Sequence, residues 1–289
     1  MTPHDFDYLR RLLKERSGLV LSAEKDYLLE SRLLPLARRQ GLSSLGELVL
    51  RLRQPGSTSL AIAVTEAMTT NETFFFRDRL PFDHLRDTVL PGLIAARGRE
   101  KRIRIWCTAE ASGQEPYSVA MVLKSMAAQL VGFRIDILAT DLSVEVIERA
   151  KAGLYSQFEV QRGLPIQLLV RHFEKSGDMW QIAPELRAMV QFRPLNLLHD
   201  FSPLGLFDII YCRNVLIYFD QTTKTGVLER LVRQMSADGY LMLGAAETVV
   251  GLTDCFRPVA DKRGLYAPTA VELRRPSSYG NVSRFVARF

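Results

Sequence analysis

The sequence predicts an α/β protein in which an N-terminal all-helical domain precedes a doubly wound, Rossmann-like domain with a small inserted β subdomain. Apolar residues recur with helical spacing from residue 6 to about residue 86, whereas apolar runs of strand length alternate with helical segments after residue 92. The stretch 154–188 interrupts that alternation. We expect domains at residues 1–88 and 89–268, the inserted subdomain at about 154–188, and a flexible tail at 269–289.

The helical domain is predicted from the spacing of its large apolar residues. Phe6, Leu9 and Leu13 fall on one face of a helix, and a second leucine-rich face follows within residues 28–36. No strand-like alternation competes with this pattern, and glycine and proline divide the region into short segments. We therefore expect several short helices that pack on each other or on the second domain.

Five apolar runs predict the strands of a parallel sheet, because strand and helix alternate as in doubly wound folds. Pro116 is expected at the first position of its helix, where proline is favoured. The expected strands are 103–107, 133–139, 189–192, 207–212 and 240–243, the expected helices are 116–130, 144–152 and 222–235, and hairpins are expected within 173–182 and 256–266.

Polar residues that directly follow the strand at 207–212 indicate a site. Ligands of open α/β sheets bind outside the carboxyl ends of the strands, where Arg213, Asn214 and Tyr218 fall. The alternative is a charged cap on the loop, with Tyr218 as a half-buried anchor. We favour the site.

The loop after the first strand predicts the cofactor. It contains one glycine, Gly113, so the G-x-G-x-x-G pattern of a dinucleotide site is absent. Glu110 and Glu115 bring negative charge that repels phosphates but suits a cationic ligand. S-adenosylmethionine carries a sulfonium and an ammonium and no phosphate, so we expect this cofactor. Alternatively, Glu115 complements the dipole of the helix that it begins.

Asp141 ends the second strand and is the strongest cofactor residue by position. An acid at this place can accept hydrogen bonds from both ribose hydroxyls. Its alternative role is the N-cap of the following helix, which Ser143 could fill instead.

The charge of the chain permits an acidic partner. The 289 residues include 38 basic and 32 acidic ones, a net charge of +6, and the sequence pI is near 9.3. This excess does not require nucleic acid. A basic patch is expected where five arginines stand against one acid, and the alternative is a solvated helix face. The arginines are Arg32, Arg38, Arg39, Arg51 and Arg53.

Cysteine and histidine spacing predicts neither a disulfide framework nor a metal site. The three cysteines form no C-x-x-C pair, and the four histidines are scattered without ligand spacing. The first residues lack a basic leader with an apolar core, and no run of about 18 apolar residues occurs. We expect buried thiols, no insertion into a membrane and a cytoplasmic location.

Four motifs stand in order at residues 69–78, at 104–107 with 113–118, at 139–141 and at 212–220. Together they resemble the bacterial chemotaxis receptor methyltransferases, the CheR-type family that methylates receptor glutamates with S-adenosylmethionine. The resemblance covers roughly residues 5–267. It implies a protein-glutamate O-methyltransferase with a helical domain, a methyltransferase domain and a small β subdomain, and methyl esters that serve chemotactic adaptation.

The resemblance also implies roles for individual residues. Arg77 and Tyr218 would face the transferred methyl group and the acceptor carboxylate, S-adenosylhomocysteine would be the product, and no metal would take part. The arginine patch would dock the acidic helical region of chemoreceptors. The implied cofactor contacts are Asn71, Thr73, Arg77, Glu115, Asp141, Asn196, Leu197, Arg213 and Asn214.

The chain departs from the family pattern in two places. Glu110 stands where relatives usually have a small residue or cysteine, and Ala111 where they have serine. Some relatives dock on a pentapeptide at the receptor C-terminus through a glycine-rich loop of the β subdomain. The segment 174–179 is short and has one glycine, so we expect methylation that is independent of this peptide.

Three consecutive phenylalanines, Phe74 to Phe76, cannot all point one way on a helix or strand. We therefore expect residues 69–78 to lie between the two domains, with Arg77 at an interdomain cleft.

Two other functions remain as alternatives. A methyltransferase for another substrate such as nucleic acid is disfavoured, because residues 213–216 lack the paired prolines and aromatic residue that hold a flipped base. A non-catalytic signalling homologue that binds the cofactor stays open because of Glu110.

Overall fold

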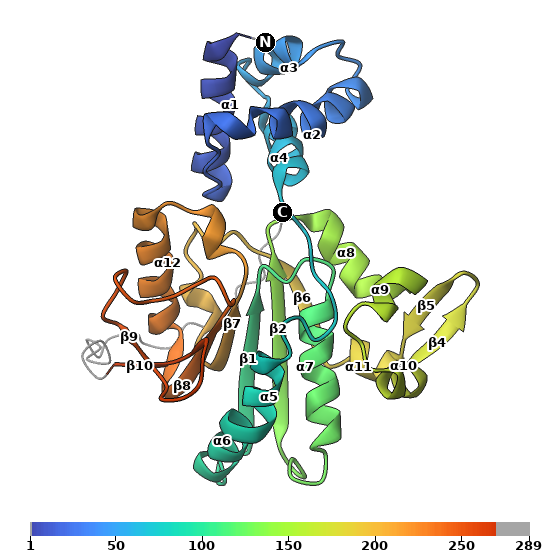
Figure 1. The fold of residues 1–289 in the computed structure, drawn as a ribbon, viewed down its shortest axis with the longest axis vertical. Helices are drawn as coiled ribbons and strands as arrows, with labels where there is room; N and C mark the ends of the chain where they lie inside the picture. Colours follow the sequence, from blue (N-terminus) through green and yellow to red (C-terminus); the bar gives the residue numbers. More distant parts are fainter. Residues whose placement is uncertain (1, 270–289) are drawn as a thin grey trace.

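A computed structural model describes residues 2–269, so the tail expected at 269–289 lies outside the described residues except for Thr269. Four helices form a layer above a seven-stranded sheet, and a three-stranded sheet projects from the side of the larger domain (Figure 1). The predicted helical domain, doubly wound domain and inserted β subdomain are confirmed.

The N-terminal domain packs its helices around a leucine core. α1 begins at Pro3 because Thr2 caps it: the Thr2 hydroxyl accepts the Asp5 N–H, and the Asp5 carboxylate accepts the Thr2 N–H. Leu9 and Leu13 are fully buried, as the helical spacing predicts. The helices are α1 (Pro3–Ser17), α2 (Asp26–Arg39), α3 (Leu45–Leu52) and α4 (Thr58–Met68), with the 3-10 helix η1 (Ala23–Lys25) before α2.

The large sheet has the order β6-β2-β1-β7-β8-β10-β9. The first five strands in that order pair in parallel, whereas β10 runs antiparallel to β8 and β9 antiparallel to β10. All five predicted parallel strands and the C-terminal hairpin are confirmed. The strands are β1 (Arg102–Thr108), β2 (Arg134–Asp141), β6 (Val190–Pro194), β7 (Phe207–Cys212), β8 (Met235–Leu243), β9 (Phe256–Pro258) and β10 (Leu265–Pro268).

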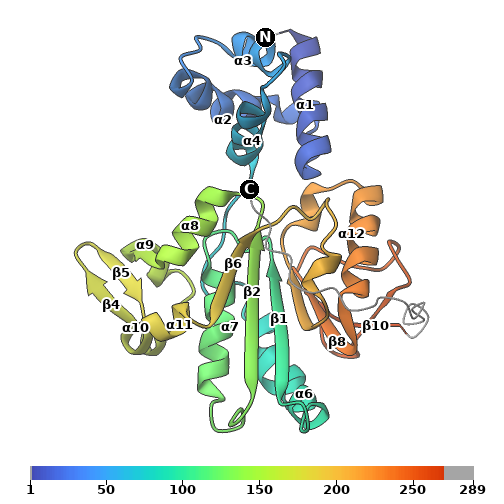
Figure 2. The same cartoon turned by 180° about the vertical axis from the view of Figure 1, so that it is seen from behind.

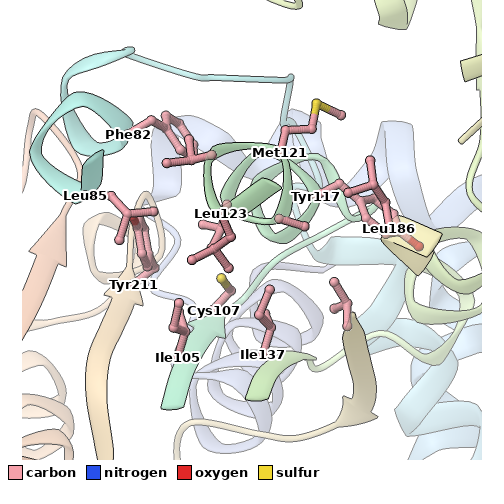
Figure 3. Packing of buried hydrophobic residues seen from close by; sticks show 14 of the residues in the cluster. Phe82, Leu85, Ile105, Cys107, Tyr117, Met121, Leu123, Ile137, Leu186 and Tyr211 are labelled. Carbon is pink, nitrogen blue, oxygen red and sulfur yellow. The ribbon is translucent and has the colours of Figure 1, made fainter. Parts of the chain in front are cut away.

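Helices cover both faces of this sheet. α7 packs over Ile105, Cys107 and Ile137 (Figure 3), while α12 packs on the opposite face around Trp106 and Ile210. The helices of this domain are α5 (Leu80–His84), the π-helix η2 (Leu85–Val89), α6 (Leu90–Ala96), α7 (Gln114–Ser125), α8 (Val144–Ala152) and α12 (Gln221–Arg233), and the 3-10 helices are η3 (Ser202–Leu204) and η4 (Leu216–Tyr218).

The predicted start and end of α7 were wrong. The helix begins at Gln114, two residues before Pro116, and ends at Ser125 instead of residue 130. It begins early because Gly113 takes φ +94 and turns the chain directly into the helix. A Cβ at this glycine would lie 3.0 Å from both Ala150 and the Tyr155 hydroxyl, so the turn is also tightly packed.

The inserted subdomain is an antiparallel sheet of order β3-β5-β4 that lies beside α8 (Figure 2). The predicted hairpin at 173–182 is confirmed. Phe173 and Ile182 are buried in the main core, which attaches the subdomain. Its elements are β3 (Leu154–Ser156), α9 (Gln157–Gln161), α10 (Ile166–His172), β4 (Phe173–Ser176), β5 (Met179–Ile182) and α11 (Pro184–Arg187).

The two domains have separate hydrophobic clusters. The cluster of the helical domain ends at Met68, whereas Phe75, Phe82 and Leu85 belong to the cluster beneath α7. The expected boundary near residue 88 stays a prediction, and these clusters favour one between residues 69 and 74.

Between residues 2 and 269, no helix is both long enough and apolar enough to cross a membrane. Cys107 and Cys212, which end apolar strands, are buried thiols as expected, and Cys255 is buried too.

Candidate active site

A cavity of about 900 Å³, its open mouth included, lies between the helical domain and the carboxyl edge of the large sheet. Ser17 and Leu19 line it from the end of α1, and Met68 lines it from α4. The loops after β1, β2, β6 and β7 form the opposite wall. This edge is where open α/β sheets bind their ligands.

Most residues that the sequence predicts for the site meet in this cavity. Glu115 is the exception, because it does not line the cavity and lies buried behind Arg213. The predicted residues in the lining are Asn71, Thr73, Arg77, Asp141, Asn196, Leu197, Arg213, Asn214 and Tyr218.

Hydrogen bonds and an ion pair hold the helical domain against the cavity. The Asn196 Nδ2 donates to the Arg16 carbonyl at 2.6 Å, and the Val20 N–H donates to the Tyr218 carbonyl at 2.9 Å. Lys14 and Asp220 form an ion pair at 2.7 Å. The loops after β6 and β7 are therefore fixed to the end of α1.

Asp141 is buried at the end of β2, beside the cavity. Its two carboxylate oxygens accept the N–H groups of Ala111 and Ser143, both at 2.9 Å. Burial raises the pKa of Asp141, and these backbone donors oppose the rise without cancelling it. Ser143 is the residue that caps α8, because its hydroxyl accepts the Val146 N–H. Asp141 is therefore not the cap.

Arg213 joins three segments of the site through a buried guanidinium. Its side chain is 1% exposed; Nη1 donates to Glu115 at 2.5 Å, and Nη2 donates to the Asp78 carboxylate and the Arg77 carbonyl. Burial lowers the pKa of Arg213, but the two carboxylates outweigh it. Burial likewise raises the pKa of Glu115, and Arg213 opposes that rise. Arg213 is therefore an internal ion-pair partner and not a solvent-facing charge. Tyr218 is half-buried, as the structural alternative expects, and it also lines the cavity.

Glu110 is a buried carboxyl group of the loop after β1. It is 2% exposed, and neither of its carboxyl oxygens has a hydrogen-bond partner. Burial first, and then the charges of Asp141 and Glu115, raise its pKa well above its ordinary value, which favours the neutral carboxyl. The negative charge predicted for Glu110 is therefore opposed by its surroundings, whereas Glu115 has Arg213 as its partner.

Replacing Glu110 by glutamine should change how stability depends on pH. Folding raises the pKa of this carboxyl group, so the folded state resists its ionisation. The group therefore destabilises the protein increasingly as the pH rises above about 4.5, its pKa in the unfolded chain. We compare the melting temperature of Glu110→Gln with that of the unmodified protein at each pH. We expect the variant's advantage to grow as the pH rises from 4.5 to 8. Thermal unfolding followed by circular dichroism measures this difference.

The matched control is Glu174→Gln on the exposed strand β4. Its difference in melting temperature should be flat over the same pH range. A flat difference for Glu110→Gln as well would mean that Glu110 ionises normally in the folded protein.

Residues 69–78 cross from the helical domain to the sheet, and their three phenylalanines have different surroundings. Phe75 is fully buried in the main core, and Phe76 packs edge-on against Phe82. The ring of Phe74 lies 5.6 Å from the Arg77 guanidinium. The segment therefore lies between the two domains, as expected, with Arg77 in the cavity lining.

Arg32 holds this segment from α2. Its guanidinium donates to the carbonyls of Met68 and Thr69 and to the Thr70 hydroxyl, at 2.8–3.1 Å. Arg32 therefore has a structural role in the linker and does not belong to the exposed part of the predicted basic patch.

Strained backbone gathers around the cavity. Of the eight non-glycine residues between positions 2 and 269 with left-handed φ, six lie in the three segments that flank it. Such conformations cost free energy and persist where packing imposes them, often at functional sites. These residues are Phe76, Asp78, Arg79, Ala109, Ala111 and Asn214, with φ between 50° and 67°.

Sequence reasoning missed several residues of the site. Ser17 and Leu19 carry no signal, because only the fold brings the end of α1 to the sheet. Glu247 could have been found from its position. It is an acid that follows the predicted strand at 240–243, just as Asp141 is an acid at the end of the second strand. Its carboxylate accepts hydrogen bonds from the loop that carries Arg213 and Asn214.

Comparison with known proteins gives two family matches. Residues 4–69 match the model of the CheR methyltransferase all-alpha domain, and residues 71–265 match the CheR methyltransferase SAM binding domain. Among curated proteins, chemotaxis protein methyltransferase 1 of Pseudomonas aeruginosa is 43% identical over 265 residues, which is 90% of this chain and 96% of that protein.

Two further relatives have similar coverage. Chemotaxis protein methyltransferase Cher2 of Pseudomonas putida is 40% identical over 90% of this chain and 96% of its own length. Chemotaxis protein methyltransferase 1 of Vibrio cholerae is 40% identical over 88% of this chain and 93% of its own length.

Proposed function

Since the chain belongs to the CheR methyltransferase family, we propose that it transfers methyl groups from S-adenosylmethionine to glutamate side chains of chemoreceptors. Residues 71–265 are the SAM-binding domain of this family, so the cofactor is S-adenosylmethionine. The products would be S-adenosylhomocysteine and glutamate methyl esters that serve chemotactic adaptation in the cytoplasm. The observation that carries the proposal is the cavity in which Arg77, Asp141, Arg213 and Tyr218 lie together.

The polar and apolar groups that line the cavity match the chemical groups of S-adenosylmethionine. Each Asp141 oxygen accepts one backbone N–H and keeps a lone pair for a ribose hydroxyl. Leu142, Leu197 and Val215 offer an apolar surface for the adenine ring. We assign the other polar contacts to five cavity residues and to Glu115, which acts from behind Arg213. The five are Asn71, Thr73, Asn196, Arg213 and Asn214.

The transfer requires no general base. When bound, S-adenosylmethionine supplies a methyl group on a sulfonium. No residue of this chain has to remove a proton, because a glutamate side chain with its ordinary pKa near 4.3 is already ionised at neutral pH. We assign Arg77 to the acceptor carboxylate and Tyr218 to a hydrogen bond near the reacting centre. Such alignment contributes on the order of 7–11 kcal/mol in favourable cases.

Transfer of radiolabelled methyl groups to membranes that contain chemoreceptors tests this function. We expect label on the receptor that mild base releases as methanol, because carboxyl esters are labile to base. Label that resists mild base, or that enters nucleic acid, would contradict the proposal. Binding of S-adenosylhomocysteine without any transfer would identify the non-catalytic homologue.

We propose that the exposed arginines of α2 and α3 dock the acidic helices of the receptor. Arg38, Arg39 and Arg51 are exposed, and Arg53 is exposed although it lies 3.6 Å from Asp5. Arg38→Glu combined with Arg39→Glu should raise the KM for receptor at least about tenfold, with a weaker effect at high salt. Cofactor affinity should stay unchanged. Steady-state methylation at two ionic strengths and calorimetry with S-adenosylhomocysteine measure these effects.

The control carries the same charge change at Arg99 and Arg257, two exposed arginines of the larger domain. Its KM for receptor should match that of the unmodified protein. If the patch variant and the control variant have equal KM values for receptor, the arginine patch does not dock the receptor and is a solvated helix face.

We further propose that methylation is independent of a pentapeptide at the receptor C-terminus. The turn between β4 and β5 has only Gly177 and Asp178 between the two strands. Isothermal calorimetry should detect no binding of such a pentapeptide in the micromolar range. Micromolar affinity would contradict the proposal.

A further inference from the structure

One carboxylate, that of Glu247, accepts four backbone N–H groups. Its Oε1 accepts from Val215 at 3.0 Å and from Leu216 at 2.8 Å. Its Oε2 accepts from Asn214 and from Gly244, both at 2.8 Å. Both oxygens of the side chain are therefore fully used by the backbone.

The three N–H groups of residues 214–216 point to one place because of an unusual backbone. Asn214 has φ +57, in the left-handed region, and Val215 follows with φ −121 and ψ −39. Successive amides in such a left-handed and right-handed sequence form a concave nest that binds an anion. In this protein the anion is a side chain of the same chain.

The held loop carries the charged wall of the cavity. Arg213 precedes the nest, Asn214 is its first residue, and Tyr218 follows one turn later; all three line the cavity. The Tyr218 carbonyl also accepts the Val20 N–H from the helical domain. The position of the nest therefore sets the position of three residues that we assign to the cofactor and the acceptor.

Gly244 leaves the space that this arrangement needs. A Cβ at this residue would lie 2.7 Å from Glu247 Oε2 and 3.0 Å from the Asn214 nitrogen. No side chain fits there without moving the carboxylate or the loop. The turn from Gly244 to Glu247 and the loop at 213–218 therefore form one packed unit at the ends of β7 and β8.

We infer that Glu247 is a positioning residue of the methyltransferase site, which fixes Arg213, Asn214 and Tyr218 by filling the backbone nest at residues 214–216. Glu247 does not appear in the cavity lining and acts through this loop. The inference rests on the proposed function only for the roles of those three residues. Its test uses cofactor binding, which does not depend on receptor methylation.

Glu247→Gln is the sharpest variant, because it keeps the shape of the side chain. One amide oxygen can still accept two N–H groups, but the amide nitrogen would face the other two donors. We expect calorimetry to give a Kd for S-adenosylhomocysteine raised at least about tenfold, which corresponds to the loss of one hydrogen bond to a charged group. A Kd within about twofold of the unmodified protein would overturn the inference.

Glu247→Ala with added formate tests whether the carboxylate itself is what matters. The small anion can occupy the empty nest, so formate should restore most of the affinity of this variant at millimolar concentrations and leave Glu247→Gln weak. Sodium chloride at equal ionic strength should restore nothing. Failure of formate to restore binding to the folded alanine variant would overturn the inference.

Asp208→Asn separates positioning from general loss of stability. Asp208 is a buried carboxylate near the start of β7, at the other end from the site, and it accepts from Arg97, Ser236 and the Arg104 N–H. This variant should lower the melting temperature and leave the Kd unchanged. The two variants are compared at the same loss of melting temperature. If Asp208→Asn raises the Kd as much as Glu247→Gln does, Glu247 has only a structural role.

The outcomes for the proposed function and for this inference are distinguishable. If the unmodified protein binds S-adenosylhomocysteine and methylates no receptor, the proposed function fails, while the binding measurements on the Glu247 variants still decide the inference.

Discussion

Arg77→Ala is expected to lower receptor methylation at least about 100-fold while the protein keeps its fold. Arg77 lines the cavity, and its Nη1 donates to the Glu72 carbonyl at 2.7 Å, which helps to hold its guanidinium in place. Removing one charged group that aligns the reacting atoms typically costs this much. The fold should persist because the side chain of Arg77 is half-buried and lies outside the hydrophobic clusters. Steady-state kinetics and thermal unfolding test both parts.

Arg79→Ala is the matched control for this prediction. Arg79 lies two residues further on, has the same charge and is exposed, but it does not line the cavity. Its variant should methylate receptors at a near-normal rate. Near-normal methylation by Arg77→Ala would show that Arg77 does not act on the acceptor or the cofactor.

Gly163→Ala should affect Arg77 indirectly, by displacing the segment that carries it. Gly163 has φ +82, and a Cβ there would overlap the Phe75 carbonyl oxygen of the same crossing segment. The neighbouring Arg162 pairs with Glu72 at 2.6 Å and lies 4.5 Å from the centroid of the Phe74 ring. Displacing this contact should move residues 72–77, so we expect turnover to fall although Arg77 itself is intact.

The residues at the strand ends could be predicted because the rule behind them is topological. In a parallel sheet the residue after each strand reaches the same edge, so Asp141, Arg213 and Asn214 had to lie together once the strands were correctly placed. Glu247 obeys a related rule, but it follows its strand by four residues, and only the turn from Gly244 returns it to the edge.

Other features of the site could not be predicted from the sequence, because they depend on burial and on contacts between distant segments. Formal charge suggested two negative glutamates in the loop after β1, but burial raises the pKa of Glu110, and Arg213 compensates the charge of Glu115. Likewise, Arg32 belongs to a run of arginines in the sequence, but the fold places linker carbonyls beside its guanidinium. No sequence pattern reports which of several arginines meets a carbonyl from a distant segment.

Arg213→Met is expected to lower the free energy of unfolding by about 3–5 kcal/mol, because it leaves the buried Glu115 without its cation. With Arg213 gone, burial raises the pKa of Glu115 against only the weaker effect of the Arg77 charge. The destabilisation should therefore be smallest near pH 4.5 and grow as the pH rises. Chemical denaturation at several pH values measures it.

Adding Glu115→Gln to Arg213→Met should recover most of that stability and remove its added pH dependence, because no uncompensated charge stays buried. Binding of S-adenosylhomocysteine should stay weak in the double variant, since the guanidinium that lines the cavity is still missing. Recovery of binding together with stability would mean that the pair only supports the fold. If the double variant is as unstable as the single one, the links from Arg213 to Asp78 and to the Arg77 carbonyl stabilise this region more than the pair with Glu115 does.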